Sequence, residues 1–138
     1  GLNFKITDLQ AALGLSQFNN LENFIKLKKD LYKQYSNLIE KNVLKTFKEY
    51  ETPWFIDLFC ENEKQRLELH EFLNNQNIET RLSYPALSLQ SYLNDTDRAD
   101  LDYSEKVASK ILWLPSSTIL TTENIGYISV QINTFFTK

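Results

Sequence analysis

The apolar periodicity of residues 21–39 constrains the fold of this chain more than any other pattern. Apolar side chains recur there every three or four residues, at Leu21, Phe24, Ile25, Leu31, Tyr32, Tyr35, Leu38 and Ile39. This spacing predicts a long amphipathic helix that must bury one face against another layer of structure. Four lysines fall on the other face and are expected in solvent: Lys26, Lys28, Lys29 and Lys33.

Shorter patterns predict four more helices and three strands. One helix follows the capping box Thr7-Asp8-Leu9-Gln10, a second follows Asn62, a third spans 97–110, and Thr121 or Thr122 caps the last. Largely apolar runs at 54–60 and 112–115 have strand length, and residues 78–81 are interpreted as a short strand. The order predicts an α+β fold in which a small antiparallel or mixed sheet is flanked by helices.

Two helices carry features that predict close packing. Ala11, Ala12, Gly14 and Ser16 are small, so we expect another backbone to approach the first helix on more than one side. Gly126 lies inside the last helix and predicts a close contact there. The helix after Asn62 has its apolar side at Leu67, Leu69, Phe72 and Leu73.

Composition excludes several classes of protein. The 138 residues carry a net charge of −3 with both signs mixed, so no basic field indicates nucleic acid. No apolar run has the length of a membrane helix. A single cysteine, Cys60, excludes an internal disulfide and fits a reducing compartment. We therefore expect one cytoplasmic domain with no nucleic-acid or membrane partner.

Residues for self-contained catalysis are few. The single histidine, His70, is flanked by apolar helix positions and is interpreted as a surface or core-edge residue. Cys60 ends an apolar run and is interpreted as a core residue. No metal-ligand spacing, GxGxxG or P-loop motif occurs. On the residues alone, Asn3 shapes a turn, Lys5 is solvated, and the irregular segment around Pro85 packs its aromatic rings on the core.

Five motifs together resemble a known family. They are GLNFKITDLQAALGLSQF at 1–18, a Pro-Trp strand at 53–54, NIETRLSYPALSLQSY at 77–92, LWLPSS at 112–117 and TxEN at 121–124. Their order is similar to the C-terminal small domain of the DegT/StrS family of sugar-nucleotide aminotransferases, which use pyridoxal 5′-phosphate (PLP). The resemblance implies the C-terminal domain of a fold-type I enzyme. We therefore expect residues 1–138 to be a single domain of a larger enzyme whose PLP-binding domain lies upstream.

The resemblance also implies site residues. Asn3 would bind the phosphate of the neighbouring subunit's PLP in a homodimer. Lys5 stands where the family usually has Arg and, with Arg81, Tyr84 and Ser88, would lie near the substrate. The catalytic lysine is expected upstream, so no catalytic residue is assigned in this chain, which alone should be inactive.

The implied reaction moves an amino group from glutamate to a nucleotide-linked keto-deoxysugar, for lipopolysaccharide or another surface polysaccharide. Two alternatives stay open: a PLP-dependent sugar dehydratase of the same family, in which His replaces the lysine, and a non-catalytic α+β interaction module. If the large domain is missing, Leu2, Leu9 and Leu13 are expected to be exposed.

Overall fold

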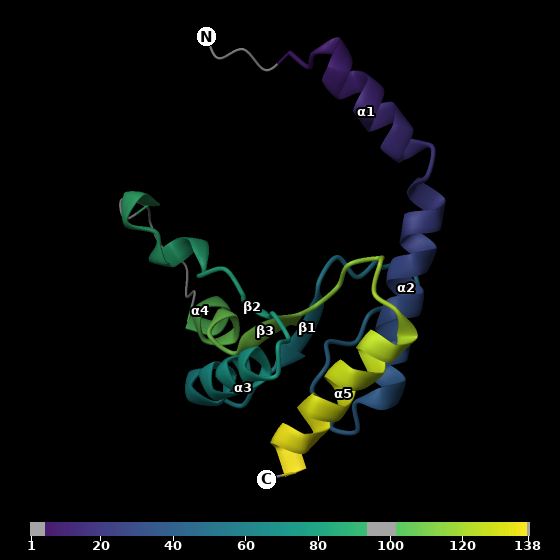
Figure 1. The fold of residues 1–138 in the computed structure, drawn as a ribbon. Helices are drawn as coiled ribbons and strands as arrows, with labels where there is room; N and C mark the ends of the chain where they lie inside the picture. The colour runs from purple at the N-terminus through teal and green to yellow at the C-terminus, as the bar shows by residue number, and fades with distance from the viewer. Residues whose placement is uncertain (1–4, 94–101, 138) are drawn as a thin grey trace.

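The computed structural model describes residues 5–93 and 102–137 (Figure 1). The helices of this part are α1 (Asp8–Phe18), α2 (Leu21–Leu38), α3 (Glu63–Asn75), α4 (Asp102–Ala108) and α5 (Thr122–Thr137). The strands are β1 (Ile56–Phe59), β2 (Arg81–Leu82) and β3 (Ile111–Leu114). Two 3₁₀ turns, Leu87–Leu89 and Ser91–Leu93, lie in the segment that the sequence predicted to be irregular.

The three strands form one antiparallel sheet in the order β1-β3-β2, which confirms the predicted fold class. Ile56 pairs with Leu114, Leu58 with Leu112, and Leu82 with Leu112. The outer edge of β1 is covered by an antiparallel bridge from Leu44 to Leu58. Only β2 therefore presents an open edge among the described strands.

One face of the sheet forms the core with the helices. Ile56, Leu58, Leu112 and Leu114 point into it, and α2, α3 and α5 supply the other side. The buried residues form one cluster: Leu31, Tyr35, Ile39, Val43, Ile56, Leu58, Cys60, Leu69, Leu73, Ile78, Leu112, Leu114, Ile125, Ile128 and Ile132. Burial at every second strand residue follows from the period of two in a strand.

Two packing expectations within the helices are wrong. Leu67 of α3 is 45% exposed, because the face that packs on α5 and β3 is set by Arg66, Leu69 and Leu73. No described atom lies within 4 Å of the position that a Cβ on Gly126 of α5 would take, so no close contact within the described chain explains this glycine.

Strand and helix bounds also differ from the predictions. The strands predicted over 54–60 and 78–81 are longer than β1 and β2, because Trp54, Phe55 and Glu79 lie outside the ladder. The helix predicted over 97–110 is described only as Asp102–Ala108, and its predicted beginning lies outside the described residues.

Helix α1 forms as the capping box predicts but does not pack on this chain. Thr7 accepts a hydrogen bond from the Gln10 amide, and the Gln10 side chain accepts one from the Thr7 amide at 2.9 Å. No residue of α1 is buried, and no described atom lies within 4 Å of a Cβ placed at Gly14. In Figure 1, α1 extends beyond α2, away from the sheet. Close packing of α1 is thus absent within the described chain.

Two helix N-termini offer a matched test of capping. The Asn62 side chain accepts a hydrogen bond from the Gln65 amide at 2.9 Å, whereas Asn20 stands at the N-cap of α2 without such a bond. We expect Asn62→Ala to lower the free energy of unfolding by about 1 kcal/mol and Asn20→Ala to change it by only a few tenths. Urea unfolding of both variants measures the difference. Equal losses would contradict the role of the Asn62 cap.

Candidate functional site

The face of the sheet opposite the core carries aromatic and charged side chains. Asp57 and Arg81 both pair with Trp113, one from each side, so the three residues form a row across the sheet. The row lies on the outer face because its neighbours along each strand, Leu58, Leu82 and Leu112, point to the core. An acid, an indole and a base thus meet on one surface.

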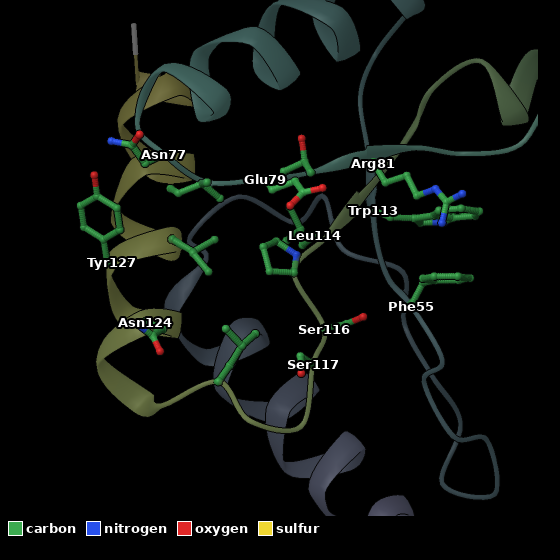
Figure 2. A pocket seen from close by; sticks show the side chains of 15 residues that line it. Phe55, Asn77, Glu79, Arg81, Trp113, Leu114, Ser116, Ser117, Asn124 and Tyr127 are labelled. Atoms are coloured by element: carbon green, nitrogen blue, oxygen red, sulfur yellow. The ribbon is translucent and has the colours of Figure 1, made fainter.

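Aromatic rings extend this row. The Phe55 ring stacks on Trp113 with centroids 4.0 Å apart and planes 6° from parallel. Tyr84 meets Trp113 edge-on at 5.0 Å, and the Arg81 guanidinium lies 5.1 Å from the centre of the Tyr84 ring. This last distance suits a cation–π contact, which holds the guanidinium in place while it stays exposed. Figure 2 shows Phe55, Trp113 and Arg81 at one end of a pocket.

Trp113 lines two pockets. The larger, about 660 Å³, is bounded by the 77–81 segment, the 115–117 loop and the first turns of α5. In Figure 2, Asn77, Asn124 and Tyr127 line its far end, opposite Arg81 and Trp113. The smaller, about 420 Å³, lies between the sheet and α4 and is lined by Asp57, Tyr84, Tyr103 and Trp113 among others. Both volumes fall within the usual range for ligand pockets, roughly 300–1,000 Å³.

The carboxyl group of Asp57 is half-buried beside the smaller pocket. Burial raises its pKa, while the positive charge of Lys45 and a side-chain hydrogen bond with Trp113 act in the opposite direction. The polar group is therefore held on a largely aromatic surface by its neighbours in the row.

Lys28 of α2 forms hydrogen bonds with the wall of the larger pocket. Its ammonium donates hydrogen bonds to the backbone carbonyls of Trp54, at 3.0 Å, and of Ser116. Burial lowers its pKa, so the expectation of a solvent-facing Lys28 is wrong. The Tyr35 hydroxyl donates to the Pro115 carbonyl at 3.0 Å. These contacts fix the 115–117 loop, which forms one wall of the pocket.

The structure brings together some of the residues that the sequence singled out and separates others. Arg81 and Tyr84 are in contact, but the Ser88 hydroxyl donates to the Glu105 carboxylate at 2.6 Å and is half-buried. Lys5 is exposed just before α1, on the segment that extends away from the sheet (Figure 1). Asn3 lies outside the described residues.

Phe55, Asp57 and Trp113 were not among the predicted site residues. The signal was present, because the polar and aromatic members of WFIDLF and ILWL alternate with the aliphatic residues that fill the core. The two segments were interpreted as apolar strands, so the outer face on which Phe55, Asp57 and Trp113 lie was not considered.

The described residues supply neither a metal site nor an evident seat for PLP. They contain no group of three or more His, Cys, Asp or Glu residues that could hold a metal ion. Lys28, the one lysine among them whose pKa burial lowers, is engaged by two backbone carbonyls. Arg81 could pair with a phosphate group, but the Lys28 contacts do not fit a Schiff-base lysine. No described helix is long and apolar enough to cross a membrane.

His70 has the core-edge position that the sequence predicted. One ring nitrogen lies 2.7 Å from the Thr80 hydroxyl and the other 3.1 Å from the Asn74 amide nitrogen. These contacts hold Thr80, the residue before β2, against α3, which accounts for His70 structurally.

Cys60 is buried, and burial raises the pKa of its thiol from 9.0 to about 11, although Arg66 and Lys41 act in the opposite direction. We expect the native thiol to resist Ellman's reagent near pH 8 and the urea-unfolded thiol to react at once. Because the pKa is higher in the folded state, the stability linked to this group is present below pH 9 and is lost as the pH rises towards 11. Rapid labelling of the native protein near pH 8 would contradict this burial.

Known proteins resemble this chain along nearly its whole length. GDP-perosamine synthase of Escherichia coli O157:H7 is 28% identical over 140 residues, which cover 99% of this chain and 38% of that protein. The lipopolysaccharide biosynthesis protein RfbH of Salmonella typhimurium is 27% identical over 148 residues, which cover 99% and 34%. This chain therefore spans little more than a third of the length of these relatives.

A solved structure agrees with the fold. The crystal structure of a DegT DnrJ EryC1 StrS aminotransferase from Brucella abortus matches with a TM-score of 0.87 and 25% identity over 100% of this chain and 38% of that one. The model of the DegT/DnrJ/EryC1/StrS aminotransferase family matches residues 1–133. Since that match covers nearly the whole sequence, the chain belongs to the DegT/DnrJ/EryC1/StrS aminotransferase family.

Proposed function

We propose that the protein containing this chain is a cytoplasmic, PLP-dependent aminotransferase that moves an amino group from glutamate to a nucleotide-linked keto-deoxysugar. The family match and the names of the two relatives support this reaction and a role in lipopolysaccharide or another surface polysaccharide. The single observation that carries a substrate-side role for this chain is the contact between Arg81 and Tyr84 beside both pockets.

The roles divide between this chain and the rest of the protein. PLP, when bound, supplies the electron sink for transamination, and the lysine that holds it lies in the large domain. Arg81 binds the diphosphate of the substrate, because its exposed guanidinium can donate two parallel hydrogen bonds to phosphate oxygens. Tyr84 orients Arg81, and Ser88 positions the 87–93 segment through Glu105.

Helix α1 places the N-terminal loop against a second subunit of a homodimer. Leu9 is 82% exposed, Leu13 64% and Phe18 69%, so this helix has an apolar surface that the rest of the described chain does not cover. Asn3 would then bind the phosphate of the neighbouring PLP, and Lys5 would add a positive charge nearby. The exposed apolar residues are the support for this arrangement.

Arg81 offers the main test of the proposed reaction. With the full-length protein, PLP, glutamate and a nucleotide-linked keto-deoxysugar, we expect Arg81→Ala to raise KM and to lower kcat/KM roughly 10- to 100-fold, since a charge-assisted contact is lost. Arg81→Lys should lose less, because it keeps the charge but not the planar fork. Formation of 2-oxoglutarate measures the rate.

The matched control is Lys64→Ala, a surface cation of α3 whose contact with Glu68 is 3.8 Å long. It should leave both kinetic constants unchanged. An active enzyme in which Arg81→Ala matches wild type would remove Arg81 from the substrate site. An upstream sequence with no lysine at the PLP position would exclude transamination, and a His there would favour dehydration.

Exposure of α1 predicts self-association of the 138-residue chain. The double variant Leu9→Ser, Leu13→Ser removes two exposed apolar side chains, so it should stay monomeric at concentrations at which the wild-type chain forms larger species. Light scattering coupled to size-exclusion chromatography measures the mass. Leu67→Ser, which removes an exposed leucine from α3, is the control and should behave as wild type. A monomeric wild-type chain at high concentration would contradict the prediction.

A further inference from the structure

The smaller pocket combines a carboxylate with aromatic rings in a way that discriminates between nucleobases. Asp57 lines this pocket together with Tyr84, Tyr103 and Trp113. The rest of the lining consists of two serines and three apolar residues: Ser83, Ser104, Val107, Ala108 and Ile111. Ser83 is itself held by a hydrogen bond from its hydroxyl to the Ala108 carbonyl. The site is therefore built from β1, β3, α4 and the segment that directly follows β2.

The Asp57 carboxylate has more lone-pair positions than its known hydrogen bond uses. A carboxylate has about four lone-pair positions on two oxygens, and the Trp113 side chain uses one of them. Lys45 lies close enough to favour the charged form of the carboxylate. Burial raises the pKa of Asp57, and Lys45 and Trp113 act in the opposite direction. Its remaining lone pairs lie in a half-buried place next to the pocket, where they can accept hydrogen bonds from a ligand.

The aromatic rings suit a flat ligand. Phe55 covers one face of Trp113, and Tyr84 stands edge-on to it at an angle of 84°. Tyr84 and Tyr103 are exposed, so their rings can stack on a base. The exposed Arg81 guanidinium next to Tyr84 supplies a positive charge for phosphates attached to such a base.

Hydrogen-bond chemistry then selects among the bases. Guanine presents the N1–H and the 2-amino group side by side, two donors that one carboxylate can accept together. Uracil and thymine present one N–H between two carbonyls, whose lone pairs would face the carboxylate oxygens. Adenine and cytosine each offer an amino donor beside a ring acceptor. Only guanine matches Asp57 with two adjacent donors.

We propose that the pocket lined by Asp57, Tyr84, Tyr103 and Trp113 binds the guanine base of a GDP-linked sugar, with Asp57 accepting from N1–H and the 2-amino group. That the substrate is a nucleotide-linked sugar rests on the proposed function. That its base is guanine is inferred from the pocket. Asp57 is then a specificity-determining residue, and Arg81 lies on the diphosphate side of the same site.

Binding of nucleoside diphosphates to the full-length protein tests the inference. We expect GDP to bind at least tenfold more tightly than UDP or dTDP by isothermal titration calorimetry. Inosine diphosphate lacks only the 2-amino group, so it should bind roughly tenfold or more weakly than GDP, since one hydrogen bond to a charged group is lost. This series needs no variant and so does not depend on how a substitution affects folding.

A substitution that changes the donor pattern gives a second, independent readout. In Asp57→Asn the amide can donate to the 2-carbonyl of xanthine, which replaces the 2-amino group of guanine. We expect this variant to bind GDP tenfold or more weakly and xanthosine diphosphate more tightly than wild type does. Asp30→Asn, on the exposed side of α2, is the matched control and should bind as wild type. A purely structural Asp57 would not produce a gain for xanthine.

Each outcome bears on one proposal or both. Tighter binding of UDP or dTDP than of GDP, equal binding of GDP and inosine diphosphate, or unchanged selectivity in Asp57→Asn would overturn the guanine inference. If the enzyme still aminates a nucleotide-linked sugar in those cases, the proposed function stands. Absence of both nucleotide binding and transamination in the PLP-loaded full-length protein would overturn both.

Discussion

The period of two in three short strands is the constraint on which the rest of this structure depends. The apolar faces of α2, α3 and α5 are buried against one face of the sheet. That face consists of Ile56, Leu58, Leu112 and Leu114. With those residues facing the core, Asp57 and Trp113 are forced to the opposite face, and Arg81 joins them through the register of β2. A slip of one residue would move the charges into the core and the leucines into solvent. Core and site are therefore two consequences of one register.

Helix α2 determines the position of the 115–117 loop through hydrogen bonds to its backbone. The loop follows β3 directly, so its path could vary widely, yet Lys28 and Tyr35 of α2 each donate to its backbone. A carbonyl that is shielded from water costs free energy unless a donor reaches it, and an ammonium is a strong donor. The contact removes water from the Lys28 ammonium, and this burial lowers the pKa of the group. The wall of the larger pocket is thus set by α2, from far away in the sequence.

Local patterns in the sequence predicted the elements of the fold, and long-range geometry decided the site. Residues within a few positions determine the caps at Thr7, Asn62 and Thr121 or Thr122, the helix predicted over 21–39 and the strand predicted over 112–115. These elements could therefore be found without the structure. The burial of Lys28 and the exposure of Leu67 depend on which helix face meets the sheet, which spacing alone leaves open. Likewise, the motif at 77–92 pointed to Arg81 and Tyr84, but only strand pairing places Asp57 and Trp113 beside them.

The stability of helix α1 is not explained by contacts within the described chain. It has eleven residues, none of them buried, and a helix of that length is marginal in water without tertiary contacts. Its capping box stabilises the first turn, by about 1 kcal/mol, but does nothing for the exposed leucines that follow. Small residues between those leucines leave room for another backbone, and nothing described here occupies that room. The sequence of α1 therefore makes physical sense only against a surface contributed from outside the described chain, and the proposed dimer contact meets that requirement.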